Sequence, residues 1–295
     1  MRNDTHQLAR LREESAALKL ILLPDDIWDS FKERCVHGAP SFHHSILLGA
    51  LECGCLDGIT EPIERFLIEN GSVRADVTPH YRKVLRESWV LAPTAEKRKH
   101  EADIFRGFLT ELQLAAWLDR QDAEITGLAA GGAAYDLVFR DSLHRECSVE
   151  VKYMGMENAI FEAILAQLSG EGPRTVWRGM YDSADYLTVR VFEAAKQLEG
   201  AGGRRVACLA LSADALDVFK GARQLGLADW RHPELARRDQ TDGMRSLLGS
   251  LEQKHSDLDN EIAARIRAMT EIWVVSVGRD FEFSWVERVR PATPD

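Results

Sequence analysis

The chain has 295 residues, of which 45% are hydrophobic and 28% charged, and its formal net charge is −10 at pH 7. This composition predicts a globular protein and excludes the disordered, collagen-like and coiled-coil classes. No segment approaches the roughly 18 uninterrupted apolar residues that a membrane-spanning helix requires, and residues 1–14 are charged rather than signal-like. We therefore expect a cytoplasmic protein without a membrane partner.

The negative charge disfavours a protein that coats nucleic acid without selectivity, because phosphate contacts supply most of that affinity. Charges more than roughly 8 Å apart are largely screened at physiological salt, so a local basic rim beside an acidic site remains compatible with nucleic-acid binding. The five cysteines are an odd number, which indicates reduced thiols rather than a disulfide framework.

The first 95 residues have the apolar periodicity of helices, with expected helices at 5–20, 25–34, 41–51 and 59–69. Turn signals at Pro24, at 38–40 and at 57–58 separate these segments. We expect residues 1–95 to form an α-helical N-terminal domain that recognises a target or binds a partner, either a second copy of the chain or another protein. Its cysteines and histidines fit no usual spacing of zinc ligands.

A long helix is expected over residues 95–121, where six apolar residues recur at helical spacing: Ile104, Phe105, Phe108, Leu112, Ala115 and Leu118. Three strand-like runs follow at 123–128, 133–139 and 146–154, and a three-strand meander is the economical interpretation. Helical patterns at 158–168 and 183–198 precede a buried strand at 206–211, introduced by the glycine-rich turn at 200–203.

The remainder of the chain is expected to be a helical insertion, about 213–269 with a loop near His232, and then two strands at 272–277 and 281–286. The last two strands are joined at 278–280. The fold class is therefore α/β, with a second domain at 96–290 that contains helix, three-strand meander, helix and strand, and a helical insertion before the last strands.

Three charged residues lie inside apolar strand patterns. Glu150 and Lys152 are two residues apart, so their side chains share one face of the strand at 146–154. Asp136 lies in the preceding run, and the turn at 141–145 would return the next strand beside it. Charged groups are seldom placed in apolar strands unless they are paired or coordinate a metal. The pattern therefore indicates a cation site.

Two further polar residues flank this set. Glu111 is expected at the margin of the apolar face of the 95–121 helix. Gln167 ends the apolar face of the 158–168 helix, where its amide could touch substrate. A solvated glutamate and an ordinary helix amide remain the alternatives for these two residues.

In this context the sequence resembles the PD-(D/E)XK, or restriction-endonuclease-like, nuclease superfamily. Asp136 followed by Glu150-Val151-Lys152 fits the motif of that superfamily, and the resemblance covers approximately residues 95–212. It extends to Glu111 on the first helix and to Gln167 on the second. Tyr135 stands where the superfamily's name places proline. The resemblance implies a restriction-endonuclease-like core of helix, three-strand meander, helix and strand.

The resemblance also implies hydrolysis of phosphodiester bonds by a nuclease that depends on Mg²⁺, for which Mn²⁺ can substitute. Asp136, Glu150, Glu111 and the Val151 carbonyl are the implied metal ligands. Lys152 would orient the attacking water or stabilise charge on the phosphoryl group, and Gln167 completes the implied catalytic set. The expected activity is that of a DNA endonuclease, with DNA favoured over RNA as the partner.

Three alternatives remain open at this point. Asp136, Glu150 and Lys152 could form an exposed cross-strand ion pair worth less than about 1 kcal/mol. The chain could be a catalytically inactive module that binds nucleic acid or protein on the same fold, because a fold does not dictate a function. It could also be an RNA nuclease effector directed by its N-terminal helices.

Overall fold

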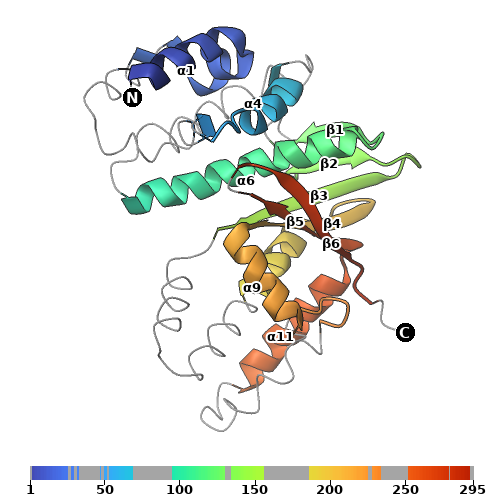
Figure 1. The fold of residues 1–295 in the computed structure, drawn as a ribbon. Coiled ribbons are helices and arrows are strands. Elements are labelled where there is room, and N and C mark those ends of the chain that lie inside the picture. Colours follow the sequence, from blue (N-terminus) through green and yellow to red (C-terminus); the bar gives the residue numbers. More distant parts are fainter. Residues whose placement is uncertain are drawn as a thin grey trace, which may run out of the picture. The chain divides into compact units, whose positions relative to one another are not determined.

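The computed structural model of the chain describes residues 2–25, 28, 29, 32, 47, 50, 51, 53–68, 95–129, 134–155, 186–224, 228–233, 252–278 and 280–292. The chain divides into two compact units. Unit 1 comprises Met1–Leu143 and Val277–Phe283, and unit 2 comprises His144–Ser276 and Ser284–Asp295. Figure 1 shows the helices and the strands that these residues form.

The N-terminal helices of unit 1 are α1 (Arg2–Glu14), the π-helix η1 (Leu18–Leu22), α4 (Asp57–Ile63) and the π-helix η2 (Glu64–Ile68). The helix expected at 5–20 is therefore interrupted after Glu14. Ser15 explains the interruption, because its hydroxyl accepts a hydrogen bond from the Leu18 N–H at 3.3 Å and so begins the next turn. The helix expected at 59–69 is confirmed as α4 followed by η2. The helices expected at 25–34 and 41–51 lie largely outside the described residues.

The long helix of unit 1, α6 (Ala95–Asp119), confirms the helix expected over 95–121. Of its expected apolar face, Phe105, Leu112 and Ala115 are fully buried. Ile104 belongs to the same expected face but is 44% exposed. It is adjacent to Phe105 in the chain, and the 100° step between neighbouring helical residues takes it off the buried stripe.

Among the described residues, the strands form one mixed six-stranded sheet in the order β1-β2-β3-β4-β5-β6. They are β1 (Glu124–Leu128), β2 (Leu137–Arg140), β3 (Glu146–Met154), β4 (Arg204–Ser212), β5 (Glu271–Val277) and β6 (Phe283–Val289). Strands β1 and β2 pair antiparallel, whereas β3 and β4 pair parallel from Cys147 opposite Arg204 to Met154 opposite Leu211. Strands β1, β2 and β3 are neighbours in the sheet in chain order, as expected for a three-strand meander.

The helices of unit 2 include residues 186–197, α9 (Ala213–Gln224) and α11 (Glu252–Arg267). Residues 186–197 confirm most of the helix expected at 183–198 and lie in the connection between the parallel strands β3 and β4, which requires a crossover. Strands β4 and β5 are the most buried, as their continuous apolar runs predict. The helix expected at 158–168 lies outside the described residues.

Two expectations about the whole chain concern its thiols and its membrane association. The cysteines that the structure describes, Cys53, Cys55, Cys147 and Cys208, are free thiols. Within the described ranges, each helix is too short or too polar to cross a bilayer.

Candidate active site

Strand β3 places Glu150 and Lys152 on one face of the sheet. Side chains two residues apart in a strand point to the same side, and Lys152 Nζ donates a hydrogen bond to Glu150 Oε1 at 2.9 Å. The contact confirms that the acid and the base share a face. It also excludes the view that both are solvated surface charges, because the side chain of Lys152 is only 17% exposed.

Glu150 is a buried carboxylate, with 4% of its surface exposed, and its chain neighbours Val149 and Val151 are buried as well. Removing a carboxylate from water costs several kcal/mol unless a charge and hydrogen bonds replace the lost hydration. In the described part of the chain, the partner of Glu150 is Lys152, which engages only Oε1. A second positive group at Oε2 would therefore stabilise this carboxylate further.

The neighbouring strand β4 contributes no charge at this position. Ala207 is in register with Glu150, and Leu209 is in register with Lys152. Residues in register on adjacent strands point to the same face, so the ion pair has apolar neighbours on the β4 side. The low polarity strengthens any electrostatic interaction that the pair makes with a cation or a phosphate.

Asp136 precedes strand β2 instead of lying within it. The expected strand at 133–139 is wrong at its start, because residues 134–136 form a bend and β2 begins at Leu137. The Asp136 carbonyl accepts a hydrogen bond from the Ala129 N–H at 3.0 Å, which continues the ladder one step beyond the Leu128–Leu137 pair. Asp136 is half-buried and belongs to unit 1, whereas Glu150 belongs to unit 2.

The other expected site residues have different outcomes. Glu111 is half-buried on α6 between the fully buried Thr110 and Leu112, as expected for the margin of a packed face. Val151 is buried on β3, in register with Cys208. Gln167 lies outside the described residues.

The described residues contain oxygen donors of the type that magnesium binds, but they do not form a preassembled cluster. Over the described ranges, no three His, Cys, Asp or Glu side chains are grouped so that they could hold a metal ion. Magnesium binds carboxylate, carbonyl and water oxygens, and it usually keeps several waters and only one or two carboxylates. The buried carboxylate of Glu150 and the carbonyl of Val151 fit that chemistry.

A second buried carboxylate, which the sequence analysis did not single out, lies at the start of β5. Glu271 is 2% exposed and accepts hydrogen bonds from Arg204 at 2.8 Å and from the indole N–H of Trp273 at 2.6 Å. Arg290 also contacts it, at 3.3 Å. The sequence feature that could have identified Glu271 is its position directly before the apolar run at 272–277. These three donors satisfy the carboxylate of Glu271, so we interpret Glu271 as a structural residue.

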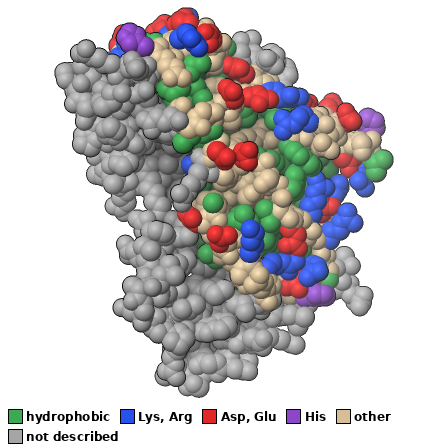
Figure 2. Space-filling model, viewed as in Figure 1, with side chains coloured by type: hydrophobic (Ala, Val, Ile, Leu, Met, Phe, Trp, Pro, Cys, Tyr) green, Lys and Arg blue, Asp and Glu red, His purple; other side chains and the backbone are tan. Residues whose placement is uncertain are grey.

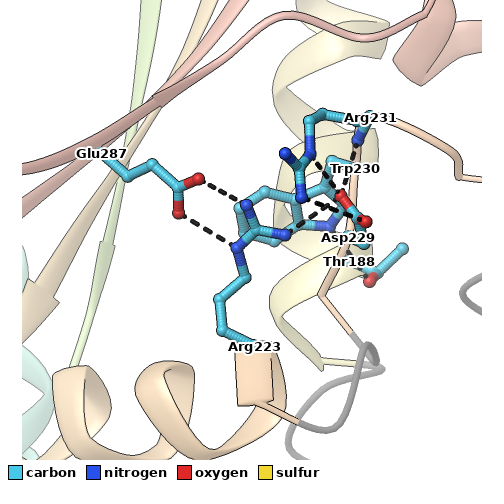
Figure 3. Close-up of polar contacts among 6 residues, drawn as sticks. All are labelled: Thr188, Arg223, Asp229, Trp230, Arg231 and Glu287. Atoms are coloured by element: carbon cyan, nitrogen blue, oxygen red, sulfur yellow. Dashed lines mark hydrogen bonds and ion pairs between the residues drawn. The ribbon is translucent and has the colours of Figure 1, made fainter.

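Figure 3 shows a further polar cluster, in which Arg223 of α9 lies between Glu287 of β6 and Asp229. Burial raises the pKa of Asp229, but hydrogen bonds from Arg231 and Arg223 outweigh burial and lower the pKa below its ordinary value. The hydrogen bond with Glu287 raises the pKa of Arg223. The cluster links α9, β6 and the segment at 228–233, which is a structural role.

Trp230 is not available to stack on a base. Trp230 is fully buried, stacks on Phe219 with ring centroids 5.7 Å apart and donates to Thr188 Oγ1 at 3.4 Å. Trp285 packs edge-on against Trp273, with Arg288 over its ring. Trp177 lies outside the described residues.

The surface of the described residues does not present one sign of charge. Figure 2 shows acidic and basic side chains next to one another on the visible face, so the net charge of −10 is not spread as a uniformly acidic surface. At physiological salt, each local charge acts over roughly 8 Å. The mixed charges on this face therefore do not repel a polyanion, such as a nucleic acid, at every point.

Comparison with known proteins identifies no relative: no protein-family model, curated protein or solved structure matches this chain.

Proposed function

We propose that this chain is a metal-dependent nuclease that hydrolyses phosphodiester bonds, with DNA as the favoured substrate and internal cleavage as the favoured mode. The observation that supports the proposal most strongly is the Glu150–Lys152 pair, a carboxylate 4% exposed and an ammonium 2.9 Å away on the same apolar strand. A buried acid with one basic partner is costly to retain for stability alone. Such groups are concentrated at functional sites.

In this proposal Glu150 holds a Mg²⁺ ion together with the Val151 carbonyl and Asp136, and Glu111 acts directly or through water. The ion, when bound, polarises a phosphoryl oxygen and lowers the pKa of a bound water. Gln167 is the remaining proposed contact with substrate. The restriction-endonuclease-like core, suggested by Asp136 and Glu150-Val151-Lys152 in a helix and strand context, is part of the same proposal.

The chain's own residues have defined tasks in the hydrolysis. The oxygen of the attacking water forms a bond to phosphorus, the bond from phosphorus to the leaving oxygen breaks, and that oxygen takes up a proton. Lys152 Nζ, held by Glu150 Oε1, would donate a hydrogen bond to the water or to a phosphoryl oxygen. Its positive charge would stabilise the negative charge that develops in the transition state.

The decisive experiment incubates the purified chain with closed circular DNA, linear DNA and RNA, each with Mg²⁺, with Mn²⁺ or with EDTA. We expect cleavage of the circle in either metal and none in EDTA, since only an endonuclease cuts a closed circle. Glu150→Gln should abolish cleavage. Glu271→Gln is the matched control, because it also replaces a buried strand carboxylate that pairs with a basic side chain.

The outcomes separate this function from its alternatives. If Glu150→Gln and Glu271→Gln have equal thermal stability and lose equal activity, the assignment of Glu150 is contradicted. Cleavage in EDTA would contradict the role of the metal. Binding of DNA without cleavage in any metal would favour the inactive binding module. Cleavage of RNA alone would favour an RNA nuclease effector.

A further inference from the structure

Two thiols of unit 1 stand on either side of one glycine, in the sequence Cys53-Gly54-Cys55. Cys53 is exposed and Cys55 is half-buried, and both are free thiols. By contrast, Cys147 on β3 and Cys208 on β4 are completely buried. Among the described residues, Cys53 and Cys55 are therefore the thiols that a dissolved reagent can reach. Neither belongs to the proposed nuclease site.

The turn between the two thiols has the hydrogen bonds of a regular helix C-terminus. The helical segment before it includes Ala50 and Leu51. The Gly54 N–H donates to the Leu51 carbonyl at 3.1 Å, and the Cys55 N–H donates to the Ala50 carbonyl at 2.8 Å. This pair of bonds defines the Schellman motif, in which a glycine takes the left-handed conformation. The φ of Gly54 is 68°, as that motif requires.

The conformation of Gly54 sets the separation of the two cysteines. The rise and radius of a helix place Cα atoms two residues apart about 5.4 Å from each other, and a left-handed residue gives the same value because its dihedral angles are the mirror image. In disulfides the two Cα atoms are roughly 4.4–6.8 Å apart. The backbone at 53–55 is therefore already compatible with a disulfide bridge.

The two thiols are also close enough to interact electrostatically. Burial raises the pKa of the Cys55 thiol above its ordinary value, and the neighbouring Cys53 and Asp280 raise it further. In thiol–disulfide exchange a thiolate attacks a disulfide sulfur, so the rate depends on access to the thiol as well as on its ionisation. The exposed Cys53 is therefore the thiol that meets a reagent first, and the half-buried Cys55 is the thiol that reacts second.

We infer that Cys53-Gly54-Cys55 is a redox-active dithiol that forms a reversible disulfide by exchange with a small-molecule disulfide such as oxidised glutathione. Cys53 loses its proton to solvent and its sulfur bonds to one glutathione sulfur. The S–S bond of oxidised glutathione breaks, and the first glutathione leaves as a thiolate that takes up a proton. Cys55 then attacks the Cys53 sulfur and releases the second glutathione in the same way. The two cysteines are oxidised, and one glutathione disulfide is reduced to two glutathione molecules.

The test is equilibration of the full chain in buffers of reduced and oxidised glutathione, followed by acid quenching and measurement of the intact mass. As the share of oxidised glutathione increases, we expect a species lighter by two hydrogen atoms, which a reducing agent converts back. Fragmentation of the tryptic peptide 35–65 should place the bridge between Cys53 and Cys55. The samples contain EDTA and no nucleic acid, so the result is independent of the proposed nuclease activity.

Variants identify the two thiols independently. Cys53→Ser and Cys55→Ser should each lose the lighter species, and Cys55→Ser should instead accumulate one glutathione on Cys53. Cys35→Ser is the matched control, because it removes a thiol from the same tryptic peptide and should form the bridge like the wild type. Absence of the lighter species in the wild type at every glutathione ratio, its formation in Cys53→Ser or Cys55→Ser, or its loss in Cys35→Ser would each overturn the inference.

Discussion

Glu150 and Glu271 show how the same residue type serves two purposes. Both are buried strand carboxylates. Glu271 accepts hydrogen bonds from Arg204, Arg290 and Trp273, which replace its hydration almost completely. Glu150 is paired with Lys152 on β3. Among the described residues, Glu271 accepts hydrogen bonds from three side chains and Glu150 from one, and this difference distinguishes a structural acid from a candidate ligand.

The Glu150–Lys152 pair predicts strong energetic coupling. Lys152→Met leaves a buried carboxylate without its partner and should lower the free energy of unfolding by about 3–5 kcal/mol. Adding Glu150→Gln removes the uncompensated charge and should recover much of that loss. Urea unfolding of the wild type, both single variants and the double variant measures the coupling. Additive effects of the two substitutions would show that the pair does not act as a unit.

The Asp229 cluster predicts a specific response to acid. The folded-state pKa of Asp229 lies below its ordinary value of 3.8, so its contribution to stability is complete above pH 3.8 and is lost as the pH falls further. Asp229→Asn should therefore be less stable than the wild type at neutral pH and lose less stability below pH 3.8. Asp217→Asn, an exposed position on α9, is the control and should follow the wild type. If the wild type and Asp229→Asn lose stability identically as the pH falls, ionised Asp229 does not stabilise the fold.

At the level of elements, the β3–β4 pairing depends on the turn that precedes β4. Gly200 and Gly203 both have positive φ, 92° and 68°. A Cβ at Gly203 would overlap the Glu146 carbonyl oxygen at the start of β3, whereas a Cβ at Gly200 would have no atom within 4 Å. The two glycines therefore separate the effect of backbone conformation from that of close approach.

This difference predicts unequal costs for the same substitution. Gly200→Ala should lower the free energy of unfolding by about 1–2 kcal/mol, the cost of a left-handed residue with a side chain. Gly203→Ala should lower the free energy of unfolding by about 1–3 kcal/mol more than Gly200→Ala does, because Glu146 or the turn must move. Denaturant unfolding of both variants provides the comparison. Equal losses would mean that the turn adapts without strain.

For the whole molecule, the proposed metal site predicts stabilisation by divalent cations. Binding to the native state alone adds roughly 2.7 kcal/mol at a metal concentration one hundred times Kd. The Tm of the wild type should therefore rise with Mg²⁺ or Mn²⁺. Asp136→Asn, which keeps the shape of the side chain but removes its charge, should respond far less.

The control for this measurement is Asp122→Asn. Asp122 is exposed with φ 59°, a conformation that asparagine tolerates, so the substitution removes one charge without disturbing the turn. All samples need matched ionic strength, because screening would otherwise imitate binding. If added metal raises the Tm of Asp136→Asn as much as it raises the Tm of the wild type and of Asp122→Asn, Asp136 is not a ligand.

The sequence by itself determined the long helix α6, the strands β3 and β4, and the shared face of Glu150 and Lys152. These features depend on periodicities of 3.6 and 2 residues, which are properties of neighbouring residues in the chain. It also indicated that Glu150 was unusual, because the residues on either side of it are apolar.

Only the tertiary structure decided how polar groups are satisfied. Glu150 has Ala207 of β4, more than fifty residues later, in register beside it. Glu271 accepts hydrogen bonds from Arg204 of β4 and from Arg290, which directly follows β6. The side-chain amide of Gln113 on α6 is oriented by the carbonyls of Gly58 and Phe281. Burial and hydrogen-bond partners come from segments distant in the chain, so no local pattern contains them.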